Sequence, residues 1–116
     1  MTRTRTYLQL PVSDMARAAR FYKQAFNLTA AMESPYWSEF SLATNVILAL
    51  HGGMQGGIEM GLGFEVEDVS SAVAEVEAAG GRVFAPVEDK PNEGIRIATV
   101  TDPDGNHIRI AQPLAR

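Results

Sequence analysis

The feature that most constrains this fold is an internal repeat, in which one short pattern occurs twice. Four positions of the first copy return in the second at a constant offset of 54 residues: Leu8, Val12, Asp14 and Ala18 recur as Leu62, Val66, Asp68 and Ala72. Each copy predicts a strand, then an aspartate that caps a helix, then the helix itself. A chain with this repeat is expected to fold as two similar modules.

Length, charge and cysteine content limit the possible functions. A chain of 116 residues with 46% hydrophobic residues is long enough to bury a core as one domain. The net charge of −4, with acidic and basic residues interspersed, predicts no nucleic acid and no membrane as partner. The absence of cysteine excludes disulfides and thiolate chemistry. With no recognisable signal peptide or membrane-spanning run, these features favour a cytoplasmic location.

The first module is predicted over residues 6–51. Two sets of residues alternate over 7–12, which is typical of a strand with two different faces: Leu8, Leu10 and Val12 on one side, and Tyr7, Gln9 and Pro11 on the other. Asp14 is the expected N-cap of a helix that ends at Asn27. Three short strands complete the module, at about 29–33, 36–42 and 45–51.

The second module is predicted over residues 60–112, after a connector rich in glycine that leaves the two halves free to pair within or between chains. A strand at 61–66 precedes the helix capped by Asp68, which is expected to stop at Gly80. The remaining strands are expected at 82–85, 95–101 and 106–112. Between the first two of these, the polar segment 86–94 is long for a hairpin and is a candidate lid.

Together these elements predict an α+β fold of paired βαβββ modules. Each module has one helix for one sheet face, so two modules pairing at their edges would form a half-barrel with a concave interior. Such an interior is a common shape for a small-molecule site. The open sheet edges also need covering, and a homodimer would cover them.

Two motifs give the chain a resemblance to a known family. The first runs from Val12-Ser13-Asp14 through Phe21-Tyr22 to Phe26-Asn27-Leu28, and the second is the turn Thr101-Asp102-Pro103-Asp104-Gly105-Asn106-His107-Ile108. Over about residues 6–112 the chain resembles the vicinal oxygen chelate superfamily, which contains glyoxalase I, extradiol dioxygenases, and fosfomycin- and bleomycin-resistance proteins. The resemblance implies the glyoxalase/bleomycin-resistance fold, and in chains of this size a dimer with sites at or near the interface.

The resemblance also implies where a metal would bind in the enzymes of this family. The four matching positions hold Tyr7, Ala49, Gly61 and Arg109, and none is a usual ligand of a divalent ion. Arg109 would repel a cation, because its guanidinium stays protonated. We therefore expect no metal and no cofactor at these positions. A displaced metal site built from His51 and His107 is an open alternative to two solvated histidines.

Ten residues are predicted to line a ligand pocket on the concave side: Tyr7, Gln9, Trp37, Glu39, Ala49, His51, Gly61, Gly63, His107 and Arg109. Arg109 is a candidate to hold a carboxylate or phosphate, or to pair with Glu39 or Glu65 across the sheet. Tyr7, Tyr36 and Trp37 are candidate walls for a flat ligand, or packing residues of the core or a dimer.

The function predicted from this pattern is metal-independent binding or sequestration of a small molecule, similar to the bleomycin-resistance branch. The alternative is a glyoxalase-like lyase or isomerase that acts on a small dicarbonyl or thiol adduct. It would use Glu39 or His51 for acid–base chemistry, and Glu65 could serve as a base if its pKa were raised by burial. A third possibility is a vestigial pocket, with the protein acting through its dimer surface. The sequence assigns no catalytic residue.

Overall fold

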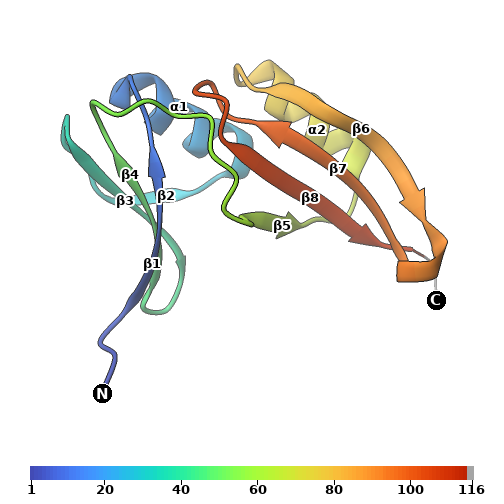
Figure 1. Ribbon diagram of the computed structural model, residues 1–116, viewed down its shortest axis with the longest axis horizontal. Coiled ribbons are helices and arrows are strands. Elements are labelled where there is room, and N and C mark those ends of the chain that lie inside the picture. The colour runs from blue at the N-terminus through green and yellow to red at the C-terminus, as the bar shows by residue number, and fades with distance from the viewer. Residues whose placement is uncertain (115–116) are drawn as a thin grey trace.

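The computed structural model describes residues 1–114 and shows the duplicated plan expected from sequence (Figure 1). The first module contains β1 (Thr6–Pro11), α1 (Met15–Phe26), β2 (Thr29–Met32), β3 (Trp37–Ala43) and β4 (Val46–His51). The second contains β5 (Gly63–Glu65), α2 (Val69–Ala78), β6 (Arg82–Lys90), a short 3-10 helix (Pro91–Glu93), β7 (Ile95–Thr101) and β8 (His107–Pro113). The prediction of an α+β fold with paired βαβββ modules is confirmed. The predicted domain also includes residues 115–116, which lie outside the described part.

Each module forms a four-stranded mixed sheet of the same topology. The strand orders are β1-β4-β3-β2 in the first sheet and β5-β8-β7-β6 in the second. In both sheets the opening strand runs parallel to the closing strand of its module, and the other neighbours are antiparallel. The repeat seen in the sequence is therefore a repeat of strand pairing.

The helix boundaries follow from capping residues that the sequence predicts. The Asp14 carboxylate accepts a hydrogen bond from the Arg17 N–H at 3.1 Å, and Asn27 ends α1 in the left-handed conformation with φ of 54°. Asp68 caps α2 in the same way, and Gly80 with φ of 102° follows the end of that helix. Within residues 1–114, neither helix combines the length and apolarity needed to cross a membrane.

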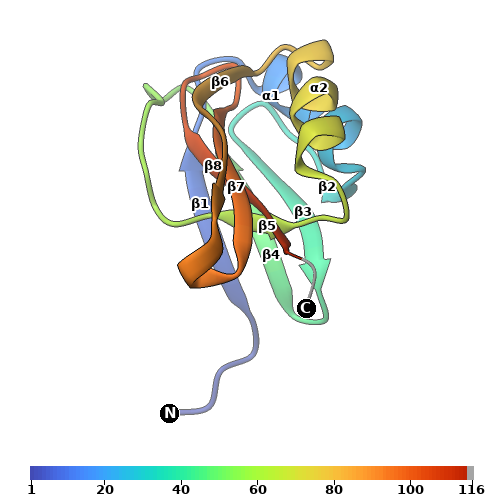
Figure 2. The same cartoon turned by 90° about the vertical axis from the view of Figure 1, so that its right-hand side faces the viewer.

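The two modules share one hydrophobic core. Helices α1 and α2 pack against each other on the same side of the two sheets (Figure 2). Phe26 of α1 stacks on Phe64 of β5 with ring centroids 4.4 Å apart, and Leu10, Phe21 and Ile110 belong to the same buried cluster. No helix covers the opposite face of either sheet within residues 1–114. We call these the first outer face, on the sheet of β1–β4, and the second outer face, on the sheet of β5–β8.

Two predicted boundaries in the second module are wrong. Strand β5 begins at Gly63 rather than at residue 61, and the segment proposed as a lid is mostly strand, because β6 runs on to Lys90. In this extension Glu88 pairs with Ile97 and Asp89 with Arg96 after irregularities in the register. An edge strand has one neighbour and is largely solvated, so polar residues and a proline are tolerated there and obscure the strand pattern.

Candidate functional site

The predicted pocket residues fall into two groups, one on each outer face. Strands β1, β3 and β4 carry the first group, in which Gln9 pairs with Ala49, Ala49 with Glu39, and His51 with Trp37. On the second outer face, Gly63 pairs with Arg109, and His107 lies two residues earlier on β8. The two cavities on the second outer face, of about 250 and 350 Å³, are lined by residues of the second group and by none of the first. The structure therefore places the predicted residues in two separate groups within one chain, and their role as a ligand site stays a prediction.

Glu39 is the most constrained polar residue of the first outer face. Arg5 donates to both of its carboxylate oxygens, at 2.8 and 3.1 Å, and the Trp37 indole N–H donates to Oε2 at 2.8 Å. These bonds, that of Arg5 first, lower the pKa of Glu39 even though its side chain is only 10% exposed. A general base at neutral pH is favoured by a raised pKa, so this condition for Glu39 to act as one is not met in this conformation.

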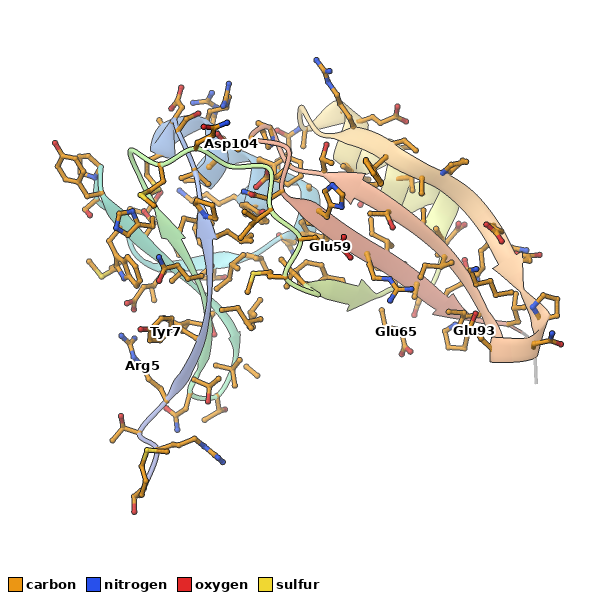
Figure 3. All side chains as sticks on the ribbon, viewed as in Figure 1. Arg5, Tyr7, Glu59, Glu65, Glu93 and Asp104 are labelled. Carbon is orange, nitrogen blue, oxygen red and sulfur yellow. The ribbon has the colours of Figure 1, made fainter. Side chains whose placement is uncertain are left out.

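Arg5 was not among the residues predicted from sequence. It lies just before β1, in the N-terminal segment that extends away from the sheets (Figure 3). The alternation that places Tyr7 on the outer face also places Arg5 there, two residues earlier. That spacing is the signal that could have revealed it.

Aromatic rings form the rest of the first outer face. Trp37 makes edge contacts with Tyr7 and His51, with ring centroids 6.0 and 5.9 Å apart. Tyr7 is 52% exposed, so one side of this aromatic group remains open. The His51 ring nitrogen Nδ1 lies 3.0 Å from the Gly52 carbonyl oxygen. Tyr36, the third predicted wall, lies outside the strands and is 74% exposed.

Arg109 is the central charged residue of the second outer face. Its strand neighbours are Gly63 on β5 and Thr99 on β7, and its side chain is exposed. Within the described residues, no acidic group lies within 4 Å of its guanidinium, so the predicted pairing with Glu39 or Glu65 is not formed. Arg109 lines two adjoining cavities of about 250 and 350 Å³.

His107 lies beside Arg109 with two partners that the sequence did not single out. The Phe84 ring lies against the imidazole with centroids 4.2 Å apart, and Glu59 Oε2 is 3.6 Å from Nδ1. Phe84 is 63% exposed and forms a wall of the smaller cavity. Because Phe84 reaches His107 across β7, only the tertiary arrangement reveals this contact.

The residues at the family's metal positions do not fit a metal. Tyr7 and Ala49 lie on the first outer face, whereas Gly61 and Arg109 lie by the second. A phenol, a methyl, a hydrogen and a guanidinium supply no imidazole nitrogen or carboxylate. In the described chain, no three His, Asp or Glu residues converge as possible ligands. His51 and His107 lie on different sheets, so one chain does not assemble the displaced site.

The two motifs that carry the family resemblance meet in a buried hydrogen-bond network rather than at a pocket. The Tyr22 hydroxyl donates to Asp102 Oδ2 at 2.8 Å, and the Asn106 amide donates to the same oxygen at 2.9 Å. Asn106 also donates to the Pro11 carbonyl at 2.8 Å, which ties the turn before β8 to β1. Burial raises the pKa of Asp102, although these donors act in the opposite direction. These residues join the two modules.

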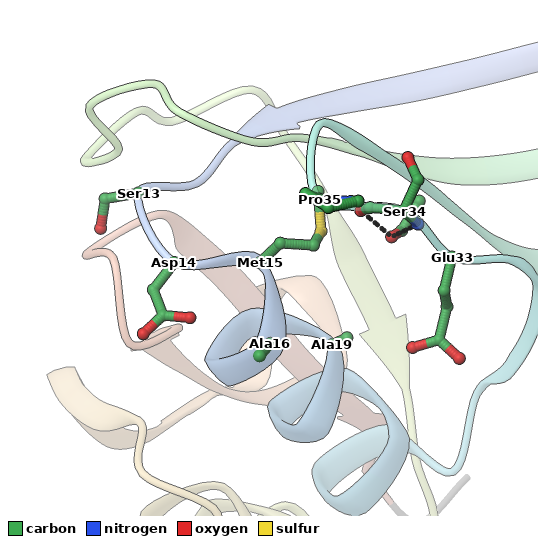
Figure 4. Close-up of a pocket in the computed structure, with 9 residues that line it drawn as sticks. Ser13, Asp14, Met15, Ala16, Ala19, Glu33, Ser34 and Pro35 are labelled. Atoms are coloured by element: carbon green, nitrogen blue, oxygen red, sulfur yellow. Dashed lines mark hydrogen bonds between the residues drawn. The ribbon is translucent and has the colours of Figure 1, made fainter.

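A cavity of about 600 Å³ lies elsewhere, between the start of α1 and the turn from β2 to β3 (Figure 4). Its two carboxylates already have structural partners: Asp14 caps α1, and Glu33 pairs with Lys23 at 2.8 Å. Ser34 is likewise bonded to the backbone of Trp37. A cavity whose polar groups are occupied in this way offers little for recognising a ligand.

Comparison with known proteins gave a consistent result. A family model described as the Glyoxalase/Bleomycin resistance protein/Dioxygenase superfamily matches residues 5–110. A glyoxalase-related enzyme from Fulvimarina pelagi is 22% identical with a TM-score of 0.79, and the match covers 96% of this chain and 88% of that one. TnmS3, an antibiotic binding protein from Streptomyces sp. CB03234, is 26% identical with a TM-score of 0.76 and 97% coverage of both chains. Curated protein sequences gave no match.

Proposed function

Because the chain belongs to the Glyoxalase/Bleomycin resistance protein/Dioxygenase superfamily, we propose that it is a metal-independent protein that binds or sequesters a small molecule. We propose further that it is a single-domain chain that works as a homodimer in the cytoplasm. The similarity to an antibiotic binding protein supports a binding role. The residues at the metal positions support it as well, since they lack the donors that the metal chemistry of the family needs.

The observation that carries this proposal is the division of the predicted pocket between two uncovered sheet faces. Each face exposes a large aromatic side chain, Tyr7 at 52% on the first and Phe84 at 63% on the second. A two-fold dimer that sets the first outer face of one copy against the second outer face of the other would cover both. It would also form two equal sites, each with an aromatic wall from one chain and Arg109 from the other.

Binding, rather than acid–base catalysis, is also the better use of the first outer face. Arg5 and Trp37 hold Glu39 in its charged form and occupy both of its oxygens. A charged, fully bonded carboxylate is a poor proton acceptor but a good rigid support for an aromatic wall. This arrangement suits recognition of a planar ligand.

The first experiment measures mass and ligand binding. Light scattering should give the mass of a dimer, and a thermal-shift screen of cationic glycopeptides, quinoxalines and aromatic acids should raise the melting temperature for at least one class. Trp37 is the single tryptophan, so its fluorescence should change when the compound binds. A monomer, or a screen without any stabilising compound, would contradict the proposal.

A mixing experiment tests whether the site is shared between chains. Tyr7→Ala and Arg109→Ala each alter an exposed residue of one outer face, so both variants should fold but bind the identified compound weakly. When equal amounts of the two variants exchange subunits, half of the dimers contain one chain of each variant. Such a mixed dimer has one intact site, built from the unchanged face of each chain, and one site that carries both substitutions. One intact site of two in half of the dimers restores about a quarter of the wild-type binding capacity. If mixing restores no binding, the site is not shared in this way.

A further inference from the structure

We propose that the second outer face recognises an aminocarboxylate, a zwitterion with an apolar body. Its carboxylate is held by Arg109, and its ammonium group faces Glu65 and Glu93. This inference rests on the proposed function, because it names the chemical class of the ligand for the same site. It is carried by the charges and shapes of the two cavities that meet at Arg109.

Arg109 is accessible to a ligand because the nearest residues on the β5 side of it, Gly61 and Gly63, are glycines and have no side chains. Gly63 is its strand partner, and Gly61 lines both of the cavities that Arg109 lines. With no acidic group within 4 Å among residues 1–114, the guanidinium has a free set of donors. A planar guanidinium with free donors is well suited to bind a carboxylate through two parallel hydrogen bonds.

The smaller cavity adds hydrogen-bond donors beside Arg109, and it is also lined by Glu59, whose carboxylate lies 3.6 Å from His107 Nδ1. Thr99 contributes a hydroxyl next to Arg109, and His107 contributes an imidazole on the same face. Both side chains can donate hydrogen bonds to a carboxylate oxygen. Phe84 covers His107 from the side of β6 and gives this end of the site an apolar wall.

The larger cavity adds two carboxylates beside Arg109. Glu65 and Glu93 are both exposed and line it together with Arg109, while Ile95, Ile97 and Ala111 supply apolar lining. Figure 3 shows the two glutamates at the lower part of the second sheet. Two carboxylates beside an apolar floor favour a ligand whose ammonium group is attached to a hydrocarbon body.

The presence of both charges around one site favours a zwitterion over a simple ion. Gly63 pairs with Arg109, and the backbone of Glu65 lies two residues, or about 7 Å, further along the strand. An anion alone would be repelled by the glutamates, and a cation alone by Arg109. A molecule that carries both charges a few bonds apart avoids both penalties.

Calorimetric titration with three matched compounds tests this inference directly. L-Phenylalanine carries both charges, 3-phenylpropionate only the carboxylate, and phenethylamine only the ammonium. We expect phenylalanine to bind wild-type dimer at least tenfold more tightly than either analogue. Arg109→Gln should weaken phenylalanine binding about tenfold and strengthen phenethylamine binding, because it removes a repelling charge. Glu65→Gln combined with Glu93→Gln should weaken the binding of phenylalanine and phenethylamine and strengthen that of 3-phenylpropionate.

Arg96→Gln is the matched control, because Arg96 lies on β7 of the same sheet but on the helix side, paired with Asp89 at 2.6 Å. It should not change the affinity for any of the three compounds. Equal affinities of phenylalanine and an analogue, no phenylalanine binding, or an unaffected Arg109→Gln variant would each overturn the inference. If the screen and the mixing experiment succeed while the phenylalanine series fails, only this inference falls and the binding function stands.

Discussion

The bond between Tyr22 and Asp102 connects the two modules, and its removal should destabilise the whole fold. The change is Tyr22→Phe, which deletes one hydroxyl and leaves the ring in the core. Tyr22 is fully buried, and its hydroxyl donates to Asp102 Oδ2 at 2.8 Å. Arg17 of α1 also pairs with Asp104 of the same turn at 3.2 Å, but the Arg17 side chain is 43% exposed, whereas the bond from Tyr22 is buried.

The magnitude follows from the state of the acceptor. A hydrogen bond to a charged group contributes about 1.5–3 kcal/mol, so Tyr22→Phe should lower the free energy of unfolding by about 2 kcal/mol. The loss should not be larger, because the Asn106 amide still donates to Oδ2 and backbone N–H groups still donate to Oδ1. Since the hydroxyl is one of the groups that lower the pKa of Asp102, that pKa should rise further in the variant.

Urea denaturation at fixed protomer concentration measures the effect. With a slope of about 2 kcal/mol per molar urea, the midpoint should fall by about 1 M. The control is Tyr36→Phe, the same substitution at a side chain that is 74% exposed, and it should change stability by less than about 0.5 kcal/mol. Equal stability losses in the two variants would refute the reasoning. A carbon-13 titration of the Asp102 carboxyl that shows no further rise of its pKa would also refute it.

Three further predictions concern charge, close packing and helix capping. Because the pKa of Glu39 is lowered in the folded protein, its charged form stabilises the fold above pH 4.5, and this stabilisation is lost as the pH falls further. In urea titrations, the stability difference between wild type and Glu39→Gln should therefore shrink below pH 4.5. Gly81→Ala would place a methyl group 2.5 Å from the Thr101 carbonyl oxygen and should lower the free energy of unfolding by about 1–3 kcal/mol. The control is Gly63→Ala, where the nearest atoms lie at 3.5 Å, and it should leave the melting temperature almost unchanged. Asp14→Ala removes the cap of α1 and should lower stability by about 1 kcal/mol in the same assay; an unchanged melting temperature would contradict the capping role.

Local features of the chain were enough to predict both helices, most of the strands and the buried face of β1, but not the extension of β6 to Lys90. The caps at Asp14 and Asp68 and the stop at Asn27 act on the neighbouring few residues, so their patterns can be read directly. Alternation along β1 likewise separates the buried Leu10 from the exposed Tyr7. The repeat extends these local patterns to a duplicated fold.

The tertiary structure alone decided how the pocket residues are grouped and which charges are paired. Arg5 and Glu39 are 34 residues apart in sequence, and their bond depends on how β1 and β3 flank β4. The lack of an acidic partner for Arg109 within residues 1–114 and the contact between Phe84 and His107 likewise depend on strand register. Capping and periodicity depend on neighbouring residues, so they can be predicted from the sequence. The partners of charged and aromatic side chains come from positions distant in sequence, so only the tertiary structure identifies them.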